Sequence, residues 1–203
     1  MQCSHRHLAA QMDGSALKIT SPLCGVIQSG YMSMYGLIVG GAVAVWWSWV
    51  ERIEPRAKKV VPWVIVAALI GARVYHVIDQ WDYYAQDWGR ILQVWNGGLS
   101  IWGAVGAGLL VLWLGIRKEE LENRRAIIAA FITPLPLAQA IGRLANGFNG
   151  EFTNLVGGIP WWAMEAILDL ALFGIVWLVE KKWRIWVYAG GYLLIRLVLQ
   201  PYR

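Results

Sequence analysis

The sequence has few cysteines, histidines and charged residues for its 203 residues, and each shortage excludes a class of protein. Cys3 and Cys24 lack the spacing of metal ligands and are interpreted as unpaired or structural thiols. His5, His7 and His76 show no ligand spacing with carboxylates, so no metal site is expected. Charged residues make up 15% of the chain and hydrophobic residues 58%. This composition excludes a water-soluble globular protein and indicates an integral membrane protein.

The sequence also has no proline-, glycine- or serine-rich linker and no internal repeat, which favours one membrane domain at residues 31–203. Residues 1–30 are interpreted as an extracytoplasmic lead-in, polar at first and interfacial later. A bilayer requires about 20 apolar residues per helix. We therefore predict an all-α fold, a polytopic transmembrane helix bundle of about six spans. The apolar windows lie near residues 31–50, 60–78, 97–116, 126–146, 161–179 and 185–200.

The basic residues are uneven between alternate loops, which predicts the orientation of the chain in the membrane. Eleven of the 18 lysines and arginines fall on one side, which we assign to the cytoplasm. This distribution explains the net charge of +5 by topology, and no nucleic-acid partner is expected. The eleven are Arg52, Arg56, Lys58, Lys59, Arg117, Lys118, Arg124, Arg125, Lys181, Lys182 and Arg184.

Four charged residues lie inside the apolar windows: Arg73, Arg143, Glu165 and Arg196. Such residues are costly in lipid and suggest a functional site. At a rise of 1.5 Å per residue, all four lie about 4 to 8 Å below the outer surface, as a polar cavity opening to the outer leaflet requires. A structural alternative is that Arg143 and Arg196 form a buried ion pair with Glu151 or Glu165.

Other polar and aromatic residues have ordinary structural interpretations. His76 and Asp79 share a helix face with Arg73, where local pairing accounts for them, and Asp169 could bridge helices one turn beyond Glu165. Tryptophans at the span ends are interpreted as a membrane-interface belt without functional information. These are Trp46, Trp47, Trp49, Trp161 and Trp162.

Two stretches stand out as candidate binding elements. The end of the fourth window packs an arginine, two amides and a carboxylate into one run, with Arg143, Asn146, Asn149 and Glu151. At the start of the third window, Gly97-Gly98 is predicted to form a turn that frees backbone N–H groups near an anionic headgroup, whereas the small residues from Gly103 onward favour close helix packing.

The ordered motifs of the chain resemble those of the bacterial prolipoprotein diacylglyceryl transferase family over about residues 30–203. The run from Gly142 to Glu151 resembles the signature of that family and is the most specific of the motifs. The others are Met34-Tyr35-Gly36-Leu37, Gly71-Ala72-Arg73, Gly97-Gly98-Leu99-Ser100-Ile101, Pro160 to Glu165, and Tyr192 with Arg196.

The resemblance implies transfer of the sn-1,2-diacylglyceryl group from phosphatidylglycerol to the cysteine thiol of a preprolipoprotein lipobox peptide. Glycerol phosphate leaves, and a thioether forms in the first step of lipoprotein maturation. The resemblance also implies a multi-pass enzyme of the bacterial plasma (inner) membrane whose active site faces the outer leaflet. No cofactor is expected, because the glycine-rich runs lie in apolar windows rather than in a strand-to-helix turn.

The resemblance also implies roles for individual residues. Arg143 and Arg196 would bind the phosphate, because a guanidinium donates two hydrogen bonds and stays charged. Glu151 would orient Arg143 or polarise the thiol, and Tyr35 would hydrogen-bond the lipid ester or phosphate. The remaining candidates for substrate binding are Asn146, Asn149, Arg73, Gly97, Gly98 and Glu165.

The chain departs from the family pattern at three places. Trp102 stands where many members have a histidine proposed as the base, which leaves Glu151, Tyr35, hydroxide or water. Gln200 stands where the family usually has glutamate, and the sequence ends before the usual seventh span. These departures favour one alternative, a non-catalytic homologue. A second alternative is a protein that binds or transports an anionic phospholipid or another anion on Arg73, Arg143 and Arg196 without chemistry.

Overall fold

The computed structural model describes residues 22–94 and 97–202, and in this part the chain is almost entirely helical. The predicted lead-in at residues 1–30 lies mostly outside the described residues. The helices are α1 (Pro22–Ile53), η1 (Pro55–Lys59), α2 (Val61–Asp79), α3 (Trp81–Ala85), η2 (Trp88–Leu92), α4 (Ile101–Ile116), α5 (Leu121–Ile132), α6 (Leu135–Phe148), α7 (Trp161–Leu178), α8 (Arg184–Leu199) and η4 (Gln200–Tyr202). A two-stranded hairpin of β1 (Leu155–Val156) and β2 (Ile159–Pro160) precedes α7.

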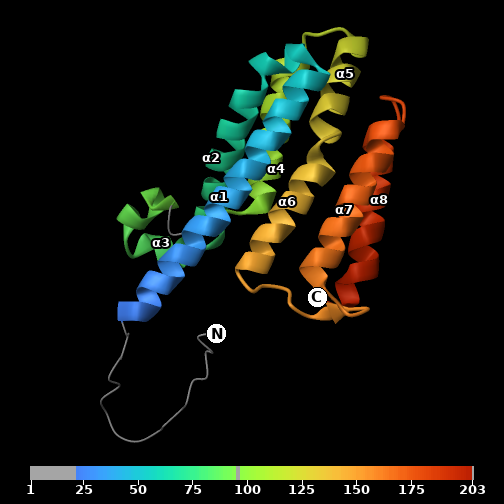
Figure 1. Cartoon of the computed structure of the whole chain (residues 1–203). Coiled ribbons are helices and arrows are strands. Elements are labelled where there is room, and N and C mark those ends of the chain that lie inside the picture. The colour runs from blue at the N-terminus through green and yellow to red at the C-terminus, as the bar shows by residue number, and fades with distance from the viewer. Residues whose placement is uncertain (1–21, 95–96, 203) are drawn as a thin grey trace, which may run out of the picture.

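The long helices run roughly side by side in one bundle, with α7 and α8 at one edge (Figure 1). The β1–β2 hairpin lies at the same end of the bundle as the C-terminus, and the α7–α8 connection lies at the opposite end (Figure 1). The predicted apolar windows overlap helices, five of them mainly one helix each and the fourth two, which confirms the all-α fold.

The fourth window differs from its prediction, because it is broken into α5 and α6 at Thr133 and Pro134. Pro134 and Pro136 have no backbone N–H, so neither can donate to the carbonyl one turn earlier. Thr133 is fully buried at this break, and its hydroxyl donates to the Ala129 carbonyl oxygen at 2.6 Å. The chain therefore bends within the fourth window rather than continuing as one straight helix.

Three helical segments of the described chain are long and apolar enough to cross a bilayer, judged by length and composition: Val61–Asp79, Leu121–Phe148 and Trp161–Leu178. The apolar helix Ile101–Ile116 is shorter. Large hydrophobic side chains are widely exposed on the bundle, among them Trp63 at 68% and Leu178 at 85%. A soluble monomer rarely exposes so much apolar surface, whereas lipid covers it in a membrane protein.

The close pairing of α2 and α4 confirms the predicted packing of small residues. The backbones of Gly71 and Gly103 touch, so that a side-chain carbon on either residue would collide with the other helix. One end of the bundle carries the basic loops with Arg52 and Lys181, and we call it the basic end. Near it, Val50, Val61, Ile127 and other apolar residues form a buried cluster between α1, α2, α4 and α5. A second cluster, around Trp161 and Leu199, joins α7 to α8.

Candidate active site

Glu165 of α7 holds two arginines from neighbouring helices. Arg143 of α6 places its Nε 2.9 Å from Glu165 Oε2, and Arg196 of α8 donates from Nη1 to Glu165 Oε1 at 3.3 Å. Glu165 is fully buried, whereas the arginine side chains are 19% and 24% exposed. The carboxylate therefore fixes both guanidiniums from inside the bundle while part of each remains open to a ligand.

Trp161 lies beneath the guanidiniums of both Arg143 and Arg196. Its ring centroid is 5.7 Å from the Arg143 Cζ and 5.9 Å from the Arg196 Cζ, which is cation–π distance. The indole is fully buried, and its Nε1–H donates to the Leu199 carbonyl oxygen at 2.9 Å. Trp161 and Glu165 are one helical turn apart on α7, so one helix face presents both the anionic and the aromatic partner.

The structure corrects the interpretation of Trp161 as a residue of a membrane-interface belt. Its ring is inside the protein and against two cations, rather than at the lipid surface. The signal in the sequence was its spacing of four residues before Glu165, which places the two side chains on the same face of a helix. We define the Arg143–Glu165–Arg196 triad and Trp161 together as the arginine site.

Gln200 contributes a weaker contact at the edge of the arginine site. Its Oε1 accepts a hydrogen bond from Arg196 Nη2 at 3.4 Å. An amide in this place supplies an acceptor without a charge, so Glu165 is the carboxylate that fixes Arg196 among the described residues. One turn deeper than Glu165, both carboxylate oxygens of Asp169 are buried with no hydrogen-bond donor in the described chain.

The loop after α6 places the other predicted residues of the fourth window. Asn149 Nδ2 donates to Glu151 Oε1 at 3.3 Å, and the Glu151 N–H donates to the Asn146 carbonyl oxygen at 2.9 Å. Asn146 is buried, whereas Glu151 is exposed. Of the two carboxylates left open as partners of Arg143, Glu165 forms the ion pair, and none between Arg143 and Glu151 occurs in the described part of the chain.

Tyr35 lies on α1, the helix that packs along α6. Its side chain is 36% exposed and has no hydrogen-bond partner among the described residues. Trp102 is 73% exposed at the start of α4.

A second cluster surrounds Arg73, separate from the arginine site. Among the described residues, its guanidinium donates only to backbone carbonyl oxygens of the segment before α4: Ile91 at 2.9 Å, Gly97 at 2.7 Å, Gly98 at 2.9 Å, Arg90 at 2.6 Å and Gln93 at 3.3 Å. Arg73 is 8% exposed, and its Cζ lies 5.2 Å from the Tyr84 ring centroid. Within the described chain, no hydrogen bond or ion pair joins Arg73 to Arg143, Glu165 or Arg196.

In the Gly97-Gly98 turn, the Gly97 N–H is not free as predicted. The Gly97 N–H donates to the Val94 carbonyl oxygen at 3.2 Å, and both glycine carbonyls accept from Arg73. Both residues adopt positive φ, 83° and 77°, a conformation that glycine adopts without strain. In this structure, Arg73 therefore organises the loop that leads into α4.

Comparison with known proteins identifies the family. The sequence model described as prolipoprotein diacylglyceryl transferase matches residues 22–203. The chain belongs to the prolipoprotein diacylglyceryl transferase family. The match includes both clusters described above, since Arg73 and the Arg143–Glu165–Arg196 triad all lie within residues 22–203.

Three curated members of the prolipoprotein diacylglyceryl transferase family illustrate the similarity. Phosphatidylglycerol–prolipoprotein diacylglyceryl transferase 1 of Streptomyces coelicolor is 36% identical over 155 residues, which cover 70% of this chain and 45% of the relative. Transferase 2 of the same organism is 34% identical over 191 residues, covering 84% and 60%. The Rhodococcus jostii enzyme is 38% identical over 155 residues, covering 70% and 43%. The chain therefore matches about half the length of these relatives.

Proposed function

We propose that this chain transfers the sn-1,2-diacylglyceryl group of phosphatidylglycerol to the cysteine thiol of a preprolipoprotein lipobox peptide. Membership of the family and the names of its curated relatives support this activity. The structural observation that carries the proposal is the pairing of Arg143 and Arg196 on one buried carboxylate, Glu165.

In the proposed reaction, the sulfur attacks a glycerol carbon of the lipid. A C–S bond forms, the bond from that carbon to the phosphodiester oxygen breaks, and the electron pair leaves with glycerol phosphate. The thiol proton passes to a base, because the thiolate is the nucleophile. Because the resemblance to the family puts Trp102 where many members have a histidine, the candidates for this base are Tyr35, Glu151, hydroxide and water.

The arginine site suits the leaving phosphate. Two guanidiniums can bind a phosphodiester through several charge-assisted hydrogen bonds and stabilise the negative charge that grows on its oxygen. Glu165 holds them in place before the lipid arrives, so less ordering is needed during binding. We assign Arg143 and Arg196 to the phosphate, and Asn146 and Asn149 to positioning of the substrate and the loop.

We further propose that this site faces the outer leaflet of a bacterial plasma membrane. Arg196 lies in the last turn of α8. Arg184 is the first residue of the same helix and belongs to the basic loop that precedes it. Basic loops usually face the cytoplasm in multi-pass proteins, and this tendency supports an arginine site near the opposite surface.

The test is to incubate the purified protein with phosphatidylglycerol and a lipobox peptide and to look for the adduct by mass spectrometry. We expect a diacylglyceryl group on the peptide cysteine and none on a control peptide with serine in that position. If phosphatidylglycerol binds but no adduct forms when a curated relative produces one, the chain is a binding protein or a non-catalytic homologue.

A further inference from the structure

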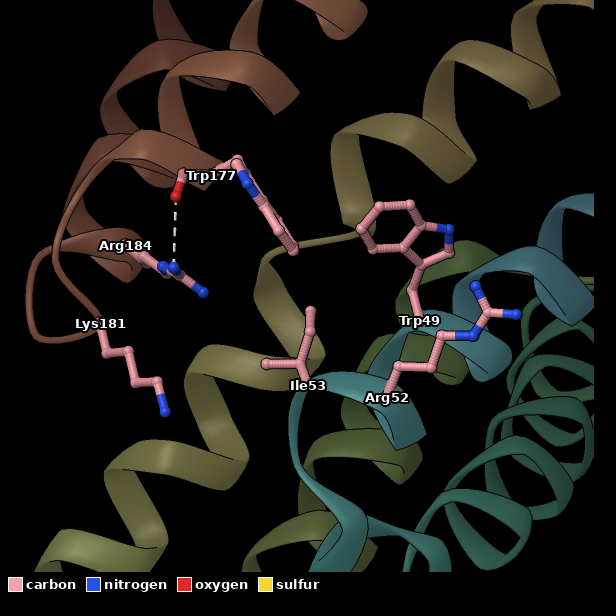
Figure 2. A pocket seen from close by; sticks show the side chains of 6 residues that line it. All are labelled: Trp49, Arg52, Ile53, Trp177, Lys181 and Arg184. Carbon is pink, nitrogen blue, oxygen red and sulfur yellow. Dashed lines mark hydrogen bonds between the residues drawn. The ribbon is translucent and has the colours of Figure 1, made fainter.

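A cavity of about 360 Å³ lies at the other end of the bundle from the arginine site. It is lined by Trp49, Arg52, Ile53, Trp177, Lys181 and Arg184. Figure 2 shows Trp177, Arg184 and Lys181 on one side of the cavity and Trp49 and Arg52 on the other, with Ile53 between them. Trp177 is twelve residues after Glu165 on α7, which separates the two places by about 18 Å along the helix.

The cavity combines three cations with no carboxylate in its lining. Two neighbouring basic residues at this end do have acidic partners: Lys182 pairs with Glu180 at 2.8 Å, and Arg125 pairs with Glu122 at 3.6 Å. Arg52 and Lys181 have no such partner among the described residues. Glu51 precedes Arg52 directly in the sequence, and its carboxylate accepts a hydrogen bond from Trp47 Nε1 at 2.5 Å. The positive charge of the cavity is therefore not neutralised by the described part of the protein.

Arg184 is held in place by neutral groups, which leaves its charge uncompensated. Its Nε donates to the Val179 carbonyl oxygen at 3.1 Å and its Nη1 to Thr133 Oγ1 at 3.0 Å. Its Nη2 donates to the Trp177 carbonyl oxygen at 3.3 Å, the contact drawn in Figure 2. A fixed guanidinium loses little conformational entropy when an anion binds.

The lining of the cavity is also aromatic and apolar. The Trp49 and Trp177 rings meet edge to face with centroids 5.2 Å apart, and Trp49 also meets Phe173 at 5.5 Å. Tryptophan rings are apolar with one polar N–H group, and they are enriched at the headgroup level of a bilayer. The rings of Trp49 and Trp177 lie near the C-terminal ends of α1 and α7. An inorganic anion needs only the cations, whereas an amphiphile uses the indoles as well.

We propose that this cavity binds the phosphate headgroup of an anionic phospholipid in the leaflet at the basic end of the bundle. The positive-inside bias alone explains the presence of basic residues in the loops, but it does not explain why three of them line one concave site together with two indoles. The bound lipid would link α1 to the α7–α8 connection at a distance from the arginine site. This site is separate from the proposed reaction and does not depend on it.

The proposal can be tested with a phosphatidylglycerol that carries a photoreactive headgroup, diluted into phosphatidylcholine vesicles that contain the protein. After illumination, peptide mapping by mass spectrometry should find crosslinks near residues 49–53 and 177–184. The double variant Arg52→Gln, Lys181→Gln should lower this yield by more than about tenfold, since each cation near anionic lipid contributes roughly a factor of five. Lys181→Gln alone should have an intermediate effect.

The matched control is Lys58→Gln, Lys59→Gln, which removes the same charge at the same end but outside the cavity. It should change the yield at the cavity less than twofold. Equal crosslinking by a photoreactive phosphatidylcholine, or equal losses in the two double variants, would overturn the proposal in favour of diffuse attraction. Loss of the crosslinks on adding excess inorganic phosphate would also overturn it, because the site would then select a free anion.

Discussion

Arg143 of α6 lies 2.9 Å from Glu165 of α7 through its Nε, and Glu165 has no exposed surface. The arginine is therefore oriented from inside the bundle, while part of its side chain remains accessible. The same carboxylate also binds Arg196 of α8. One acidic residue thus joins three helices and positions both proposed phosphate ligands.

Glu165→Gln should destabilise the protein and reduce transfer. The amide keeps the size of the side chain but removes the charge that both arginines share, so we expect a loss of about 1.5 to 3 kcal/mol in the free energy of unfolding. Thermal unfolding in detergent measures it. Glu180→Gln, which breaks the exposed pair with Lys182, is the control and should leave the melting temperature unchanged. Equal effects of the two variants would contradict a central role for Glu165.

Arg143→Gln should abolish most of the transfer while the protein remains folded. Removal of one charge-stabilising donor typically costs about 10² to 10³ in rate. Arg143→Lys should recover only part of the rate, because lysine restores the charge but not the paired donors of a guanidinium. The adduct on the lipobox peptide measures the rate, and Arg125→Gln, at an exposed ion pair, is the control. Full activity of Arg143→Gln would remove this residue from the proposed mechanism.

Trp161→Phe should make the positions of Arg143 and Arg196 less fixed without leaving a large cavity in the core. Phenylalanine keeps an aromatic face beneath the guanidiniums but loses the hydrogen bond to Leu199, at a cost of about 1 kcal/mol in stability. We expect a several-fold lower rate as well. Trp186→Phe, on the exposed surface of α8, should alter neither quantity. A normal rate and melting temperature in Trp161→Phe would show that the indole N–H is dispensable.

Gly98→Ala should destabilise the loop before α4 more than Gly97→Ala does. Both glycines have positive φ, so each alanine is strained by about 1 kcal/mol or more. Only at Gly98 would the added carbon also collide, lying 2.6 Å from Arg73 Nη1 and 2.7 Å from His76 Cδ2, whereas the space at Gly97 is open. The melting temperatures of the two variants measure this difference, because Gly97→Ala adds backbone strain alone and Gly98→Ala adds both strain and a collision. A larger loss for Gly97→Ala would argue against Arg73 as the organiser of this loop.

The helices could be predicted from the sequence because apolar run length is a local property. The windows near residues 60–78 and 161–179 correspond closely to α2 and α7. The break between α5 and α6 was missed, although Pro134 and Pro136 are visible in the sequence. Hydropathy alone does not register the missing N–H groups of proline, and the apolar composition continues across the break.

The partners of the charged residues could be predicted only in part. Counting residues along each helix predicts that Arg73, Arg143, Glu165 and Arg196 lie at a similar depth in the membrane. It does not predict which neighbouring helix each side chain faces. The packing of α6, α7 and α8 brings three of them together, whereas Arg73 turns toward the loop before α4. The choice between Glu151 and Glu165 as the partner of Arg143 depended on the same packing.

The sequence by itself determined that this is an all-α membrane protein, where its apolar segments lie, and which family its motifs resemble, because hydropathy and motif order are read along the chain. Only the tertiary structure decided that Glu165 joins Arg143 to Arg196, that Trp161 lies inside the protein beneath them, and that Arg73 binds backbone carbonyls. The physical reason is that a buried charge must find its partner across helices, and the rotation of each helix in the bundle selects that partner.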